Sequence, residues 1–172
     1  MQAALTGKSN SMTSDDFTTR IRIRSAIPDD VPVLKQCEQG IISAERPYDH
    51  TLRPDPISYY DVGELVMSDD AEVAVIELEG EIIATGYAHK QPSKPYVESD
   101  YHAFLGFMFV HPDHRGKGLN RLLMDHLFAW ARSRGLPEVR LEVYSNNTPA
   151  IRAYEKTGFK PYITEMRLNL ED

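Results

Sequence analysis

The segment from residue 103 to residue 133 constrains the fold more than any other part of the sequence. Residues 103–110 read AFLGFMFV and are apolar throughout, which is typical of a central strand covered on both faces. A turn with the sequence H-P-D-H-R-G-K-G follows, and a Leu-rich helical stripe begins at Leu119. The chain therefore needs a layered architecture in which a buried strand leads through a glycine-containing turn into an amphipathic helix.

The remaining patterns predict a mixed α/β (α+β) protein. Alternating or β-branched patterns predict strands at residues 19–26, 71–78, 81–89, 139–143 and 162–170. Helical patterns occupy residues 28–40, 57–67, 119–134 and 149–157, with Thr148 as the expected N-cap of the last helix. The predicted order is β-α-α-β-β-β-α-β-α-β, a mixed, mostly antiparallel sheet with helices on both faces. A doubly wound parallel sheet is the alternative.

Length and charge limit the organisation and the partners. A chain of 172 residues favours one domain, since domains hold about 100–200 residues. We expect that domain at residues 19–172, after a disordered tail at 1–18, unless translation starts at Met12. Lys and Arg number 19 against 26 Asp and Glu, a net charge of −7. That balance excludes sequence-independent nucleic-acid binding and favours a cationic or small-molecule partner.

Several other classes of protein are disfavoured by the sequence. The single cysteine, Cys37, excludes an internal disulfide and a cysteine-based zinc cluster. His111 and His114 supply only two imidazoles without a third ligand in register, so no metal is expected. No apolar run approaches the ~20 residues of a membrane span. The first 17 residues hold no apolar core of a secretory signal, so a cytoplasmic location is the default expectation.

The turn before the Leu-rich helix carries the wrong charge for its position unless it binds an anion. Arg115 and Lys117 occupy the place where acids normally complement the positive end of the helix dipole. Gly116 and Gly118 allow successive N–H groups to converge on a phosphate. A glycine-containing turn with solvated basic residues is the simpler alternative. The spacing of a Walker loop is absent, and Arg121 stands where a G-x-G-x-x-G pattern requires glycine.

A second motif, N-x-x-A-x-x-x-Y-E-K-x-G-F, runs from Asn147 to Phe159. Together with R-G-K-G before a Leu-rich helix, it resembles the GNAT superfamily of acyl-CoA-dependent N-acyltransferases. The resemblance covers residues 20–170 by element order, and its specific matches lie in 110–123 and 141–159. The sequence departs from the family pattern at Asn120, where the family has Gly or Ala. The Asn120 side chain would either crowd the pyrophosphate or donate a hydrogen bond to it.

The resemblance implies acetyl-CoA as co-substrate. The pantetheine arm would pair with the strand edge at Phe109 and Val110 and with Asn147, while Tyr154 would lie near the sulfur. The strands that hold Val110 and Val143 would diverge to admit the thioester. The implied pyrophosphate-binding residues are Arg115, Gly116, Lys117, Gly118, Leu119 and Asn120.

This arrangement suits direct attack of an amine on the thioester. A backbone N–H of the strand would stabilise the developing oxyanion. Tyr154 would protonate the departing thiolate, because the thiol pKa of ~8.5 and the tyrosine pKa of ~10 make this transfer nearly balanced. A core aromatic is the alternative role for Tyr154. The glutamate that some family members place on the central strand falls at Phe104. Glu142, His102 or a water could replace that base. The alternative for Glu142 is an exposed strand residue, and the alternative for His102 is a loop histidine.

The resemblance to the GNAT superfamily also implies an acceptor pocket between the first two helices. Glu45, Tyr48, Asp49 and His50 lie there, and their negative charge favours a cationic amine. We therefore predict a single-domain N-acetyltransferase that acetylates a primary amine of a small molecule, amino acid, peptide or protein in a ternary complex. The alternatives are a different acyl donor, a hydroxyl acceptor, or a non-catalytic acyl-CoA-binding regulatory module. The strand expected at 162–170 could pair between subunits to form a homodimer.

Overall fold

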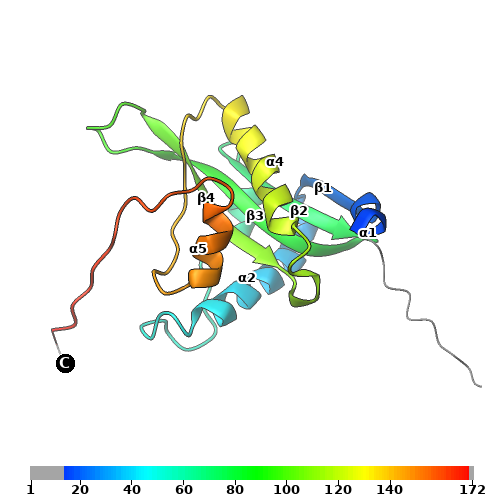
Figure 1. Cartoon of the computed structure of the whole chain (residues 1–172), viewed down its shortest axis with the longest axis horizontal. Coiled ribbons are helices and arrows are strands. Elements are labelled where there is room, and N and C mark those ends of the chain that lie inside the picture. Colours follow the sequence, from blue (N-terminus) through cyan, green and yellow to red (C-terminus); the bar gives the residue numbers. More distant parts are fainter. Residues whose placement is uncertain (1–13, 171–172) are drawn as a thin grey trace, which may run out of the picture.

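A computed structural model describes residues 14–170 and contains one five-stranded sheet with the order β1-β2-β3-β4-β5 (Figure 1). β1 to β4 pair antiparallel, and β5 pairs parallel with β4. The strand bounds are Ile21–Ser25, Ala71–Leu78, Glu81–Pro92, Tyr101–Val110 and Val139–Arg140. The mostly antiparallel mixed sheet is confirmed, and the doubly wound parallel alternative is wrong.

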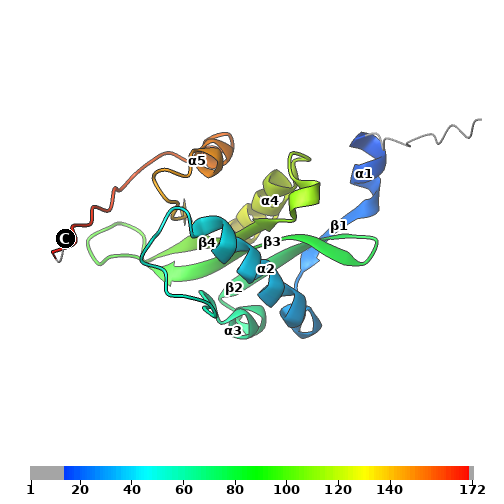
Figure 2. The ribbon, with the colours of Figure 1, turned by 90° about the horizontal axis from the view of Figure 1, so that it is seen from below.

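Helices cover both faces of the sheet (Figure 2). α2 (Val31–Glu45) and α3 (Val62–Met67) pack on one face, where Leu34, Val75 and Phe107 are buried. α4 (Leu119–Ser133) and α5 (Thr148–Glu155) lie on the other face, where Leu123 and Leu127 of α4 are fully buried. Each such buried side chain contributes about 1.5–3 kcal/mol of transfer free energy. The short 3-10 helices η1 and η2 span Pro28–Asp30 and Pro112–His114.

The hairpin predicted between β2 and β3 is confirmed. Its two turn residues, Glu79 and Gly80, both have a left-handed backbone, with φ of 54° and 88°. Two such residues in succession match the twist of the flanking strands, which is why a glycine at the second position favours this turn.

Helix α2 is longer than predicted, because Gly40 does not end it. A Cβ at Gly40 would lie 2.6 Å from the Phe109 ring, so glycine is required there by the close approach of α2 to β4. The helix continues for five more residues to Glu45. The second helix is shorter than predicted, since residues 57–60 form a loop and α3 begins at Val62. At α5 the N-cap is Asn147, whose side chain accepts from Ala150 N, so the assignment to Thr148 is wrong.

The strand predicted at residues 162–170 is wrong. The structure describes this segment without regular secondary structure, and its alternating apolar side chains are exposed, with Met166 at 90%. A strand needs a partner edge, and β5 ends after two residues, so the expected pairing does not form. The segment instead contacts the loop after α2, where Arg167 Nη2 lies 3.3 Å from Asp49 Oδ1.

Part of the predicted N-terminal tail is helical. α1 spans Ser14–Arg20, and Phe17 is 6% exposed within the cluster that α4 forms on the sheet. Phe17 supplies the apolar anchor that the surrounding polar composition conceals. Residues 1–13 of the predicted tail lie outside the described residues. No helix in the described range 14–170 combines the length and the apolar character that crossing a bilayer requires.

Candidate active site

The site begins at an unpaired edge of the central strand. β5 pairs only with Ala103 and Phe104 of β4, so the two segments separate before Val110 as the resemblance implied. His111 N donates to Ile83 O of β3 at 2.8 Å, and therefore the preceding N–H, that of Val110, faces away from β3. A ligand with an extended polar chain can pair with this edge.

A β-bulge lies next to this edge. The register between β3 and β4 shifts between Thr85 and Tyr87, and opposite the shift Phe107 has a φ of 58°. Left-handed backbone in a bulky residue stores strain and persists only where packing enforces it, and Phe107 is 2% exposed. Gly86 accommodates the bulge, since a Cβ there would lie 2.5 Å from Met108 Sδ. The bulge therefore directs the backbone groups of β4 toward the gap beside β5.

The turn between β4 and α4 presents a row of free backbone donors. Gly116 and Gly118 have φ of 76° and 79°, and open space surrounds both. Within the described residues, the five N–H groups from Gly116 to Asn120 donate to no acceptor, and no side chain caps α4. Unsatisfied donors at the positive end of a helix dipole bind anions. The geometry therefore fits a diphosphate.

Two basic side chains flank these donors. Arg115 Nε donates to Val110 O at 3.2 Å and keeps the guanidinium beside the strand edge. Lys117 Nζ lies 4.7 Å from the centroid of the Phe17 ring and 3.3 Å from His114 Nδ1. Burial, followed by the charge of Lys117, lowers the pKa of His114, so the positive charge stays on the lysine. The contact with α1 thus holds Lys117 at the turn, a detail that the sequence did not indicate.

Tyr154 lies on α5, and Asn147 is the N-cap of that helix. Burial, followed by the negative charge of Glu45, raises the pKa of Tyr154 to about 12, so its hydroxyl remains a proton donor at neutral pH. The ring packs against Phe159 with centroids 6.0 Å apart. Asn147 Oδ1 accepts from Ala150 N at 3.3 Å, which leaves the amide nitrogen as the group that can donate to a ligand.

Aromatic and acidic side chains form a cluster beyond the end of α2. The rings of Tyr48 and Tyr144 stack with centroids 6.1 Å apart, and Tyr144 Oη donates to Asp49 Oδ2 at 3.4 Å. The hydroxyl and N–H of Thr51, followed by Arg167, lower the pKa of Asp49 to about 2. A guanidinium of the chain itself therefore contacts the carboxylate that the sequence assigned to the acceptor pocket.

Glu45 and Tyr59 lie close to this cluster. Glu45 is half-buried at the last position of α2, and burial raises the pKa of its carboxyl, while the neighbouring Tyr59 hydroxyl lowers it. The Tyr59 hydroxyl is buried and has no hydrogen bond of standard geometry to a described residue. Burial, followed by the charge of Glu45, raises the pKa of Tyr59 to about 12. The sequence analysis missed Tyr59, because residues 57–67 were assigned to one helix.

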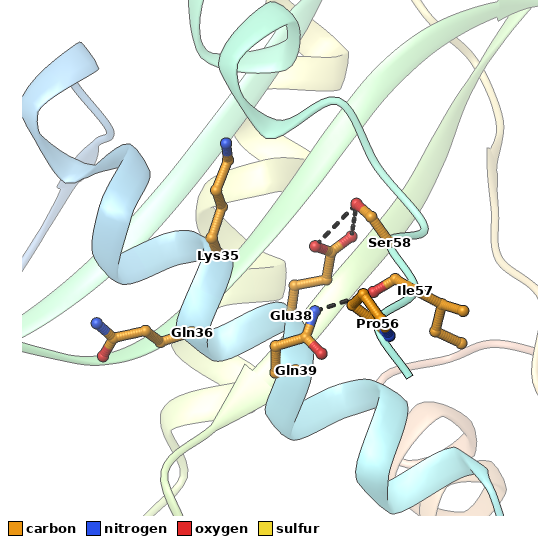
Figure 3. Close-up of a pocket in the computed structure, with 7 residues that line it drawn as sticks. All are labelled: Lys35, Gln36, Glu38, Gln39, Pro56, Ile57 and Ser58. Carbon is orange, nitrogen blue, oxygen red and sulfur yellow. Dashed lines mark hydrogen bonds between the residues drawn. The ribbon is translucent and has the colours of Figure 1, made fainter. Parts of the chain in front are cut away.

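The buried carboxylate of Glu38 holds the loop that contains Tyr59, and the sequence analysis missed this residue as well. Glu38 is 2% exposed, and its carboxylate accepts from the Ser58 hydroxyl and from the backbone N–H groups of Tyr59 and Tyr60 at 2.7–3.0 Å. Figure 3 shows Glu38 directed at Ser58 across the surface depression between α2 and residues 56–58. One feature of the sequence pointed to a buried acid: Glu38 directly follows Cys37 within the apolar stripe of α2.

The two bases suggested by the sequence are placed very differently. Glu142 is exposed on the segment after β5. Burial, followed by the negative charge of Glu142, raises the pKa of Tyr87 to about 12. His102 lies opposite Gln91 near the start of β4, with Nδ1 3.1 Å from Ser93 Oγ. At ~3.3 Å per residue, roughly 20 Å of strand separate His102 from Phe109, so His102 is not brought to the site.

The two turn histidines do not combine with other ligands. Their rings lie 5.8 Å apart in the turn between β4 and α4. In residues 14–170, no group of three or more His, Cys, Asp or Glu side chains is placed to hold a metal ion.

The profile of the acetyltransferase (GNAT) family matches residues 39–159, which include the strand edge, the glycine turn and α5. The chain belongs to this family. Curated relatives match over short segments. A streptothricin acetyltransferase of Streptomyces lavendulae is 52% identical over 50 residues, which are 29% of this chain and 26% of that protein. A mycothiol acetyltransferase of Acidothermus cellulolyticus is 36% identical over 83 residues, 48% and 22% respectively. The matched segments thus span about a quarter of these relatives.

Solved structures confirm the GNAT fold over most of the chain. A Bacillus halodurans protein has a TM-score of 0.77 at 19% identity, with 87% of this chain and 99% of that chain covered. A predicted acetyltransferase of Clostridium acetobutylicum, solved with acetyl-CoA, has a TM-score of 0.67 at 19% identity, with 88% and 97% covered.

Proposed function

We propose that this chain transfers the acetyl group of acetyl-CoA to a primary amine by direct attack in a ternary complex. The observation that carries the proposal is the row of five backbone N–H groups from Gly116 to Asn120, which follow the unpaired end of β4 and donate to no acceptor among the described residues. Family membership supports the same reaction. We assign the activity to the predicted domain, residues 19–172, with α1 as an accessory to the glycine turn.

The main chain would bind and orient the co-substrate. The N–H groups of the turn, together with Arg115 and Lys117, would hold the diphosphate, including the contact at Leu119. The edge at Phe109 and Val110 and the Asn147 amide would position the pantetheine arm. When bound, acetyl-CoA supplies an acyl group activated as a thioester. An N–H of β4 next to the bulge would stabilise negative charge on the carbonyl oxygen.

Tyr154 would assist departure of the thiolate. Its pKa of about 12 lies several units above the ~8.5 of a thiol, so full proton transfer is less balanced than the sequence suggested. The hydroxyl would therefore act first as a hydrogen-bond donor to the developing thiolate. Solvent completes the protonation.

The acceptor would be a cationic primary amine. Glu45 and Asp49 supply negative charge, and the rings of Tyr48, Tyr59 and Tyr144 supply faces that attract cations. The relatives are named for streptothricin, for mycothiol and for a ribosomal-protein alanine, and such names agree with a small-molecule or protein acceptor.

The test is release of free thiol from acetyl-CoA with a panel of polyamines, aminoglycosides, amino acids and peptides. We expect turnover with at least one cationic amine, and none with neutral alcohols of similar size. A series of longer acyl-CoA donors in the same assay establishes the donor. Coenzyme A binding without thiol release from any donor or acceptor would contradict the proposal and favour a regulatory acyl-CoA-binding module.

A further inference from the structure

Glu45 lies where the two helical layers of the site meet. α2 covers one face of the sheet and ends at Glu45, whereas α5 covers the other face and carries Tyr154. The loop that enters α5 lies beside the C-terminal end of α2 (Figures 1 and 2), where the Tyr48 and Tyr144 rings stack. Gly40 of the same helix contacts Phe109, and Glu45 is about 7.5 Å farther along the helix axis. Glu45 follows the buried Ile41 and Ile42 by four and three residues, so its side chain lies on the face of α2 that packs on the sheet.

Tyrosines, rather than cations, surround this carboxylate. After burial, the charge of Glu45 is the next cause that raises the pKa of Tyr59 and of Tyr154. It contributes less to the raised pKa of Tyr60, where Tyr87 ranks ahead of it, and of Tyr144, where Asp49 ranks ahead of it. The two nearby arginines form ion pairs with other carboxylates. Arg46 pairs with Asp55, and Arg167 pairs with Asp49.

Glu45 itself has no ion pair with any residue of the described range. A half-buried carboxylate without a cationic partner leaves part of its desolvation cost uncompensated. A ligand ammonium would supply the missing charge.

We propose that Glu45 is the general base that takes the proton from the ammonium group of the acceptor. The inference rests on the acetyl transfer proposed above and adds the residue that starts it. An alkylamine with a pKa of ~10.4 is about one part in a thousand neutral at pH 7, so direct attack needs a proton acceptor beside the thioester. Glu45 fits this role better than the exposed Glu142 and the remote His102.

The protons and electrons balance through named groups. Glu45 accepts one proton from the ammonium, and the nitrogen lone pair forms the new C–N bond at the thioester carbonyl. The C–S bond then breaks with its electron pair on sulfur, where Tyr154 donates a hydrogen bond and solvent supplies the proton. The second nitrogen proton leaves to solvent, as does the proton held by Glu45. The products are the amide, free coenzyme A and one proton.

The two groups are coupled by charge. Ionised Glu45 contributes to the raised pKa of Tyr154, and this contribution disappears once Glu45 is protonated. Proton abstraction from the amine therefore makes Tyr154 a stronger acid just before the thiolate departs. The same loss of charge removes one of the contributions that raise the pKa of Tyr59 and Tyr144.

The primary test compares Glu45→Gln with the wild-type protein on an accepted amine. Because general bases contribute about 10²–10⁴ in rate, we expect kcat to fall about 100-fold or more. The wild-type acidic limb of kcat/KM should lie above the usual carboxyl range, since burial raises the pKa of Glu45. In the variant that limb should disappear, and the rate should rise about tenfold per pH unit toward the pKa of the amine.

The controls separate the base from other roles. Glu64→Gln removes an exposed carboxylate on α3 and should keep the wild-type limb. A Glu45→Gln effect confined to KM, with kcat unchanged, would mean that Glu45 only binds the cation, and it would overturn the proposal. Loss of the limb in Glu142→Gln instead would overturn it too. Absence of turnover in the wild-type protein would count against the proposed function rather than against Glu45 alone.

A third variant tests the local geometry around the base. The Tyr59 hydroxyl lowers the pKa of Glu45, so Tyr59→Phe should move the acidic limb to higher pH. Because the aromatic ring remains, coenzyme A affinity should stay within about twofold, a factor equal to less than 0.5 kcal/mol. A limb that stays in place, or one that moves to lower pH, would show that another group titrates in this profile.

Discussion

The proposed binding site for acetyl-CoA, here the donor half, and the proposed binding site for the amine, here the acceptor half, are built in different ways. The donor half consists of the β4 edge, the glycine turn and the start of α4, which are contiguous in sequence and contribute mainly backbone N–H groups. The acceptor half consists of side chains from the end of α2, the Tyr59 loop, Tyr144 and Arg167. The donor half therefore depends on backbone conformation, and the acceptor half depends on packing between distant segments.

This difference predicts that the two halves tolerate substitutions differently. Backbone recognition needs glycines at fixed spacing, because only they adopt left-handed φ without strain. Side-chain recognition allows any residue of suitable charge and shape, so an acceptor pocket can change while the fold persists. Variants that damage one half should leave the other measurable.

The largest effect is expected from Gly118→Val. A β-branched residue at φ 79° is strained, and its side chain would occupy the open space in front of the free N–H groups. Coenzyme A affinity measured by calorimetry should fall at least about 100-fold, roughly 2.7 kcal/mol. Gly135→Val is the matched control, since Gly135 has φ 68° in open space beyond the opposite end of α4. Equal loss of affinity in both variants would contradict the division into halves.

Tyr154→Phe should lower kcat by about 10- to 100-fold, because the donor to the departing thiolate is removed. Coenzyme A affinity should change less than twofold, since the ring still packs against Phe159. Thiol release and calorimetry measure the two quantities separately. Tyr96→Phe, at a residue that is 78% exposed, serves as the control. Wild-type turnover in Tyr154→Phe would remove this residue from the mechanism.

Glu38→Gln should damage the acceptor half alone. The buried carboxylate accepts from two backbone N–H groups and one hydroxyl, and an amide satisfies them less well. The free energy of unfolding should fall by about 1–3 kcal/mol, and KM for the amine should rise while coenzyme A affinity is kept. Denaturant titration and steady-state kinetics provide both numbers. A parallel loss of coenzyme A binding would mean that Glu38 supports the whole domain.

The smallest effect is expected at an ion-pair network outside both halves. Arg24 bonds Asp30 and Glu77 at 2.6 Å each and, as the largest cause, lowers the pKa of Asp30. A carboxyl whose pKa is lower in the folded protein stabilises it above the unfolded value of ~3.9 and loses that contribution as pH falls. The wild-type protein should therefore lose stability below about pH 4 more steeply than Asp30→Asn, as followed by thermal unfolding. Parallel curves would contradict this assignment.

The donor half could be predicted from sequence to a large extent. The apolar strand, the Gly116 and Gly118 turn and the Leu-rich helix are local patterns, and local patterns determine local backbone. The position of Lys117 against Phe17 was not predictable, because it depends on a helix within the expected tail.

The acceptor half could be predicted only as a region. Glu45, Tyr48 and Asp49 were identified as candidates, but their neighbours Tyr59 and Tyr144 approach through the tertiary fold. The buried role of Glu38 depends on a loop twenty residues away. The alternation at 162–170 predicted a strand, yet strand formation requires a free partner edge, which sequence periodicity does not report.

The most direct measurement is a pair of calorimetric titrations of the wild-type protein, one with coenzyme A and one with pantetheine, which lacks the diphosphate. Charge-assisted hydrogen bonds contribute about 1.5–3 kcal/mol each, so even two of them predict that coenzyme A binds at least about 100-fold more tightly. Equal affinity for the two compounds, or no binding of coenzyme A, would show that the turn from Gly116 to Asn120 does not hold a diphosphate, and the account would fail.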